Sequence, residues 1–231
     1  MKCGALWRRA TVQVIGIAVL LGTVAVSGGC NYVAWVAQII PQKIKAVYRL
    51  EDRPTLVMVE DPKHVFDDPT IVARISHEMT DALSHAHAIS QLIDPGKVDS
   101  LIVSLGNDYQ RVGIDQVGRA VGAQQVVHVH VDWALLYPQP GFFRPAAALE
   151  VKVIDVIGHR RLFPLAGMSG NDGGEALRGH MVKVQMGPRG GVEPGAVTDR
   201  AAWHTLASRM ARDAARIFYG HYPRQPGEPF E

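Results

Sequence analysis

Two long strand-like segments in the middle of the chain constrain its fold most. QVVHVHVDWALLY (residues 125–137) and AAALEVKVIDVI (residues 146–157) are rich in β-branched residues, and Pro138, Pro140, Gly141 and Pro145 lie in or at the end of the stretch between them. Such a pair with a turn-rich joint predicts a β-hairpin. Alternation along the first segment places His128, His130 and Asp132 on one face, and Val127, Val129 and Val131 on the other.

Further segments predict the remaining elements. TLVMVED (residues 55–61) is nearly continuous in apolar residues and predicts a buried central strand. Asp68-Pro69 and Asp94-Pro95 each open a helical pattern, because the aspartate can cap and the proline suits the first turn. A third short helix is expected to end at Gly122, and a last helix is expected over 198–219 with Thr198 or Asp199 as its cap.

This order of elements predicts an α/β fold: a single three-layer-like sandwich with a mixed sheet, a long hairpin and packed helices, including a C-terminal one. A short strand is expected at residues 88–90, and RRLFP (residues 160–164) is expected to pair with the hairpin. The glycine-rich residues 166–197 predict a long surface loop. We therefore expect one domain over 54–222 and a disordered tail over 223–231.

The first thirty residues have the layout of an export signal. Basic residues precede a short apolar stretch over about residues 12–26, and small residues 27–29 lead directly to Cys30. This arrangement resembles the lipobox of bacterial lipoproteins, although Ser27 occupies a place where Leu, Val or Ile is usual. The resemblance implies that residues 1–29 are removed, that the Cys30 thiol carries lipid, and that residues 30–53 form a tether. An ordinary signal peptide and a retained membrane helix stay open as alternatives.

Location and charge follow from that prediction. Loss of Lys2, Arg8 and Arg9 takes the formal charge from +2 to −1, without the basic surplus typical of nucleic-acid binders, so no nucleic-acid partner is expected. Asn31 stands where an aspartate would retain some lipoproteins at the inner membrane, which favours an outer-membrane anchor facing the periplasm. With Cys3 removed and Cys30 acylated, the mature chain has no thiol for a disulfide, a zinc–thiolate site or a nucleophile.

IDQVGRAVGAQQVVHVHV (residues 114–131) and LEVKVIDVIGHRRLFP (residues 149–164) resemble one known superfamily. It comprises the curli-export lipoprotein CsgG, the amino-terminal domain of TolB and the lipoprotein activators of peptidoglycan synthases. The resemblance covers about residues 54–220 and implies an envelope lipoprotein whose domain binds another protein. Histidine replaces a glycine of the long strand, and we find no pair of amphipathic pore-forming segments, so pore formation is not implied.

A metal site is the main alternative function. Two imidazoles and a carboxylate at His128, His130 and Asp132 are plausible ligands, but same-face residues lie about 6–7 Å apart along a strand, too far for one ion to be held easily by all three. His77-Glu78 begins a zinc-protease pattern that fails, because Asp81 stands in place of the second histidine. No hydrolase or phosphate-loop motif is found.

The sequence thus predicts a non-enzymatic, membrane-anchored lipoprotein without a cofactor. Its α/β domain is expected to bind or regulate a protein partner in the cell envelope, in secretion or cell-wall assembly. A metal-binding periplasmic protein is the alternative. Assembly of several copies through an exposed edge of the hairpin is a third expectation.

Overall fold

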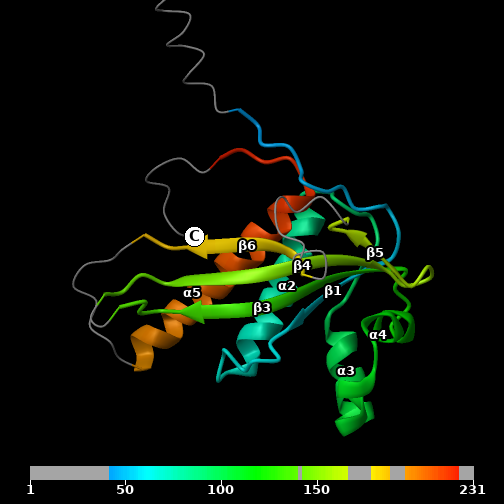
Figure 1. Cartoon of the computed structure of the whole chain (residues 1–231), viewed down its shortest axis with the longest axis horizontal. Helices are drawn as coiled ribbons and strands as arrows, with labels where there is room; N and C mark the ends of the chain where they lie inside the picture. The colour runs from blue at the N-terminus through cyan, green and yellow to red at the C-terminus, as the bar shows by residue number, and fades with distance from the viewer. Residues whose placement is uncertain (1–41, 140–141, 166–177, 188–195, 224–231) are drawn as a thin grey trace, which may run out of the picture. The chain divides into compact units, whose positions relative to one another are not determined.

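The computed structural model describes residues 42–139, 142–165, 178–187 and 196–223 (Figure 1). Residues 45–221 fall into one compact unit. Within the described ranges, no helix combines the length and the apolar character needed to cross a bilayer. Cys30, the signal segment, the first half of the expected tether and most of the expected tail lie outside the described residues.

Six strands form one sheet, which is mixed as predicted. Their order is β2-β1-β3-β4-β5, and β6 pairs with the same side of β4 as β5 does. Strand β1 is parallel to β2 and β3, whereas the pairs that β4 makes are antiparallel. The strands are β1 (Thr55–Glu60), β2 (Leu92–Ile93), β3 (Gln125–Leu135), β4 (Ala146–Asp155), β5 (Arg160–Phe163) and β6 (His180–Gln185).

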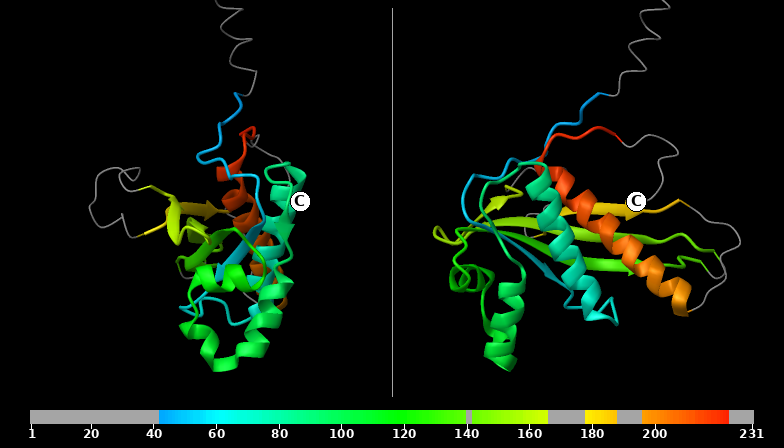
Figure 2. Two further views of the ribbon diagram at one scale, coloured as in Figure 1. Left: turned by 90° about the vertical axis from the view of Figure 1, so that its right-hand side faces the viewer. Right: turned by 180° about the vertical axis from the view of Figure 1, so that it is seen from behind.

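Helices cover the two faces of the sheet unequally. The helical elements are α2 (Pro69–His85), α3 (Gly96–Leu105), η1 (Gly106–Arg111), α4 (Ile114–Ala120), α5 (Ala196–Ala215) and η2 (Arg216–Phe218). Helices α2 and α5 lie side by side on one face (Figure 2). Helices α3 and α4 lie on the other face, near one end, while the hairpin β3–β4 and strand β6 extend away from them (Figure 1).

The main core joins the valine face of β3 to α2 and α5. Val127, Val129 and Val131 are fully buried, and they contact the apolar sides of both helices. The capped start of α2 is also as predicted: Asp68 accepts the N–H of Thr70 at 2.9 Å. Burial of one apolar face of each strand and helix is the main source of stability in such a fold.

A smaller core lies under α3 and α4. It contains Met58, Val126 and Val117, among others. A Cβ on Gly118 of α4 would come within 2.7 Å of Val126 and 2.8 Å of Val156, so only glycine lets this helix approach β3 so closely. The helix ends before Gly122, whose φ of 83° confirms the predicted left-handed residue.

Four expectations need correction. Residues 166–197 are not one loop, because β6 forms within them and pairs with Ala146–Val151 of β4. The short strand lies at Leu92–Ile93, not at residues 88–90.

Helix α5 begins at Ala196, before the expected caps, and the carboxylate of Asp199 instead accepts the hydroxyl of Tyr137 at 2.7 Å. Within the expected tether, Tyr48 stacks on Phe163 with ring centroids 5.0 Å apart, so the folded domain begins before residue 54.

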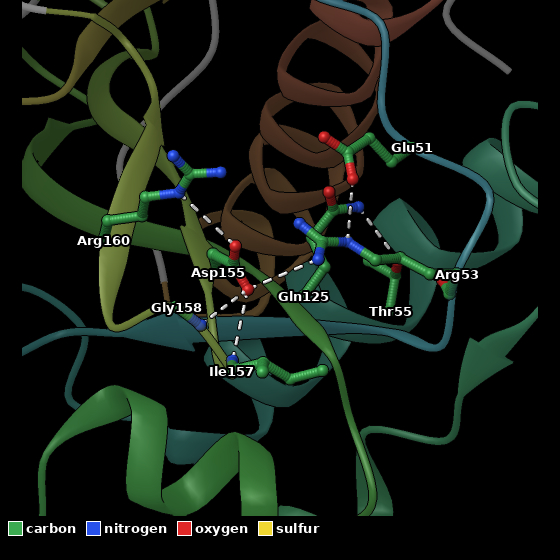
Figure 3. A network of polar contacts seen from close by, with 8 residues as sticks. All are labelled: Glu51, Arg53, Thr55, Gln125, Asp155, Ile157, Gly158 and Arg160. Atoms are coloured by element: carbon green, nitrogen blue, oxygen red, sulfur yellow. Dashed lines mark hydrogen bonds and ion pairs between the residues drawn. The ribbon is translucent and has the colours of Figure 1, made fainter.

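A buried carboxylate, Asp155, closes the turn after β4 (Figure 3). Its Oδ1 accepts the backbone N–H of Ile157 and of Gly158, both at 3.1 Å, and lies 3.3 Å from Nη1 of Arg53. Its Oδ2 lies 3.6 Å from Nε of Arg160. These donors, the N–H of Gly158 foremost and then the charges of Arg53 and Arg160, hold the pKa of Asp155 below its ordinary value.

The same network ties together three strand ends. Thr55, at the start of β1, donates its hydroxyl to the carbonyl of Arg53 at 2.7 Å and accepts the amide of Gln125 at 3.0 Å (Figure 3). Gln125 begins β3, and Asp155, which ends β4, pairs opposite it. The network therefore fixes the register at this end of the sheet.

Asp155→Asn should weaken the domain in a pH-dependent way. Because the folded-state pKa of Asp155 lies below its ordinary value of 3.8, its stabilisation is fully present above that pH and is lost as the pH falls through the folded-state pKa. We expect the difference in unfolding free energy between wild type and Asp155→Asn, measured by urea titration, to shrink as the pH falls from about 6 to about 3. Asp81→Asn, at an exposed carboxylate of α2, controls for the lost charge. A difference that is constant with pH would contradict this role.

Candidate functional site

A large hollow in the domain lies at the carboxyl end of β1. It is a pocket of about 810 Å³ between β1, the loop that follows, the first half of α2, helix α3 and η1. Ligands of open α/β sheets commonly bind outside the carboxyl ends of parallel strands. The polar side chains among its lining residues are Glu60, Asp61, His64, Asp67, Ser76, His77, Asp99 and Tyr109.

The loop after β1 is held in shape by Asp61. Its two carboxylate oxygens accept the backbone N–H groups of Val65 and Phe66, each at 2.9 Å. Phe66 is buried and packs edge-on against Trp203 of α5, with ring centroids 5.4 Å apart. The rim of the pocket on this side is therefore fixed to the main core.

Glu60 joins the pocket to the polar face of the sheet. Its Oε2 lies 2.8 Å from Nε2 of His128, whose side chain is almost fully buried. The hydrogen bond from His128 lowers the pKa of Glu60 below its ordinary value, although burial opposes this shift. Nδ1 of His128 is buried and has no hydrogen-bond partner among the described residues. The Nε2–H form of the imidazole, which donates to the carboxylate, suits this environment.

Tyr109 supplies a neutral hydroxyl on the opposite wall. Burial, followed by the negative charges of Glu60 and Asp99, raises the pKa of Tyr109 to about 12. The phenol therefore stays protonated at physiological pH and keeps its hydrogen-bond donor. The pocket is thus lined by carboxylates, by this hydroxyl and by apolar side chains, among them Val72, Val98 and Ile102.

His128 and His130 alternate with the buried valines as predicted, whereas Asp132 lies at a β-bulge between Val131 and Trp133, and the three polar side chains have different surroundings. His128 contacts Glu60, whereas Asp132 pairs with Lys63. His130 stands opposite Glu60 on β1 and Glu150 on β4, and burial lowers its pKa. In the part of the chain that the structure describes, no group of three or more His, Cys, Asp or Glu side chains is arranged to hold a metal ion.

Sequence reasoning missed Glu60, Asp99 and Tyr109 as pocket residues. The signal for Glu60 was its place at the end of a buried parallel strand, directly before Asp61-Pro62. Asp99 and Tyr109 had no comparable signal, because only the packing of α3 and η1 brings them to the pocket.

Comparisons with known proteins give no family. No family model matches the sequence, and no curated protein matches it. The predicted kinship with CsgG and TolB therefore stays a prediction.

Several solved structures resemble the domain distantly. Lipoprotein GNA1162 from Neisseria meningitidis has a TM-score of 0.42 at 13% identity, over 65% of this chain and 98% of that chain. A PelC dodecamer from Paraburkholderia phytofirmans has a TM-score of 0.38 at 8% identity, over 75% and 96% of the two chains. The hypothetical protein CT253 from Chlamydia trachomatis has a TM-score of 0.40 at 12% identity, over 71% and 93%. Likeness at this level carries no inference about activity or partners.

His128→Ala should raise the pKa of Glu60 more than His130→Ala does. His128 lowers that pKa through a hydrogen bond, the largest contribution, whereas His130 acts only through its charge. NMR titration of the Glu60 side-chain carboxyl in both variants measures the two shifts. Loss of the buried hydrogen bond should also reduce the unfolding free energy of His128→Ala by about 1–3 kcal/mol. Equal shifts in the two variants would refute the assigned contact.

Proposed function

We propose that this chain is a lipid-anchored protein of the bacterial cell envelope whose α/β domain binds a protein partner and catalyses no reaction. The anchor rests on the sequence: a basic start, a short apolar stretch, and small residues directly before Cys30. An acylated thiol would hold the domain at the membrane, most simply the outer membrane on its periplasmic side.

The observation that best supports partner binding is that helices cover the two faces of the sheet unequally. Two helices close the valine face, but the second face has its described helical cover only at the α3–α4 end. On its far half, Trp133 and Leu135 keep 39% and 50% of their surface exposed. A β-bulge between Val131 and Trp133 shifts the alternation of β3, so both side chains lie on the face away from the valines, opposite Ala148 and Ala146 of β4. Neighbouring exposed apolar side chains on one sheet face favour an interaction surface over isolated exposure.

Strand β6 adds a second feature of such a surface. Among the described strands it pairs with β4 alone, so its other side presents backbone N–H and C=O groups. A strand of the partner, or of a second copy of this chain, could continue the sheet there. Confinement near the membrane would raise the effective concentration of the domain for a partner in the same layer. Partners in secretion or cell-wall assembly fit this arrangement.

Cys30→Ser tests the anchor. Without the thiol no acyl chain can be attached, so we expect the precursor to accumulate or the protein to move from the membrane fraction to the soluble fraction. Fractionation with immunoblotting measures this, and metabolic labelling with an alkyne fatty acid should lose its signal. Cys3→Ser is the matched control, since Cys3 lies in the segment expected to be removed. Unchanged maturation and sedimentation of Cys30→Ser would overturn the proposal.

Photo-crosslinking tests the binding surface. A benzophenone amino acid placed at Trp133 or Leu135 should give one discrete crosslinked species in intact cells. The same probe at Ile157, which is 67% exposed and lies in the turn after β4, should not give it. The Trp133 product should also require Cys30. The same pattern from all three positions, or no discrete product from Trp133 and Leu135, would contradict partner binding at this face.

A further inference from the structure

The pocket at the end of β1 has no part in the proposed partner surface, and it exists because β2 is short. Strand β2 pairs only with Thr55 and Leu56, so no described strand covers residues 57–60 of β1 on that side. The space beyond β2 is bounded by α2 and α3 and forms the pocket of about 810 Å³. That volume is within the usual range for small-ligand sites, about 300–1,000 Å³.

Backbone groups of β1 face this space. In a strand, the N–H and C=O of one residue point to the same edge, and those of the next residue point to the opposite edge. Every second residue therefore offers its backbone groups to the same neighbour. The N–H of Thr55 donates to Gln91 on the β2 side, and the carbonyl of Val57 accepts the buried Ser76 hydroxyl of α2 at 3.0 Å. Val59 is the next residue in this series, and it lines the pocket. The floor of the pocket therefore offers a peptide N–H and C=O to a ligand.

The charge of the lining selects the kind of ligand. Four carboxylates line the pocket, Glu60, Asp61, Asp67 and Asp99, and none of its lining residues is Lys or Arg. Asp61 is occupied by two backbone N–H groups, and Oε2 of Glu60 by His128. Lys63 comes from the same loop, but it contacts Asp132 and is not among the lining residues. A concave surface with one sign of charge concentrates ligands of the opposite sign.

Apolar groups complete the site. Val59, Val72, Val98, Ile102 and Val112 form much of its wall, and Ile102 remains 38% exposed although it lies on a helix with an apolar side. The ring of Tyr109 stands among them and can face a cation as well as donate a hydrogen bond. A ligand with an apolar body and one cationic end would satisfy both kinds of lining.

We propose that this pocket binds a ligand that carries an ammonium or guanidinium group on an apolar body, with the cation placed between Glu60, Asp99 and Tyr109. The group belongs either to a free small molecule or to a basic side chain of an extended peptide lying along the open edge of β1. Both sources share the same chemistry, and the peptide would in addition use the backbone groups of Val59.

Saturation-transfer NMR on the full-length chain in detergent tests the charge preference. The probes are hexylammonium, hexanol and hexanoate, which share an apolar body and differ in charge. We expect hexylammonium to bind most tightly, hexanol more weakly, and hexanoate not measurably. Equal binding of the three probes, or a preference for hexanoate, would overturn the proposal.

Substitutions of the lining carboxylates test whether the cation binds in this pocket. Asp99→Asn, at an exposed position in the first turn of α3, and Glu60→Gln should each weaken hexylammonium binding about two- to five-fold, the range for a partly exposed ion pair. Binding of hexanol should not change. Asp81→Asn on the outer side of α2 is the matched control and should bind as the wild type does. Because Asp99→Asn retains the Glu60–His128 contact, unchanged binding in that variant would overturn the assignment even if Glu60→Gln were unstable.

Peptide probes distinguish the two sources. Acetyl-Val-Lys-Val-amide should bind more tightly than hexylammonium if the natural cation is a basic side chain of an extended segment, and no more tightly if it is a small molecule. Acetyl-Val-Glu-Val-amide is the control and should not bind in either case. If neither the lysine peptide nor hexylammonium binds, the pocket does not take cations and the proposal is wrong.

Discussion

Strand β3 is the element on which the rest of the structure depends. It is paired along both edges, parallel to β1 and antiparallel to β4, so its alternation fixes which side chains face each layer. The valines at 127, 129 and 131 point to α2 and α5 and are fully buried. A shift of one residue in register would move these valines to the polar face and the histidines into the core, which would be strongly unfavourable. The Asp155 network holds the register at one end, where Gln125 pairs with Asp155.

Two regions of the domain suit different kinds of contact. Among the described residues no helix covers the far half of the second face, which carries Trp133 and Leu135 and suits the proposed contact with another protein. The pocket beside β1 is concave, acidic and partly apolar, which fits a small group enclosed on several sides. Glu60 and His128 lie between these regions, because Glu60 lines the pocket while His128 belongs to the polar face.

Some functional residues could be read from the sequence and others could not. Alternation placed His128, His130 and Asp132 on one face, but spacing along a strand says nothing about the neighbours of each side chain. Those neighbours, Glu60 from β1 and Lys63 from the following loop, come from distant parts of the chain. Strand β6 was missed because HMVKVQ is short and lies between glycine-rich stretches, so its pairing with β4 left little local signal.

The sequence alone determined the strand hairpin, the capped start of α2, the glycine after α4 and the mixed α/β class, because each follows from local periodicity or from a residue with a restricted backbone. It also gives the only basis for an anchor at Cys30. Tertiary structure alone decided the pocket, since it requires β2 to stop after two residues and α3 with η1 to pack across the gap. Tertiary packing also decided that, in the part of the chain that the structure describes, helices close one face of the sheet and cover only one end of the other. Such features arise from contacts between residues far apart in the chain, whose energies no local pattern records.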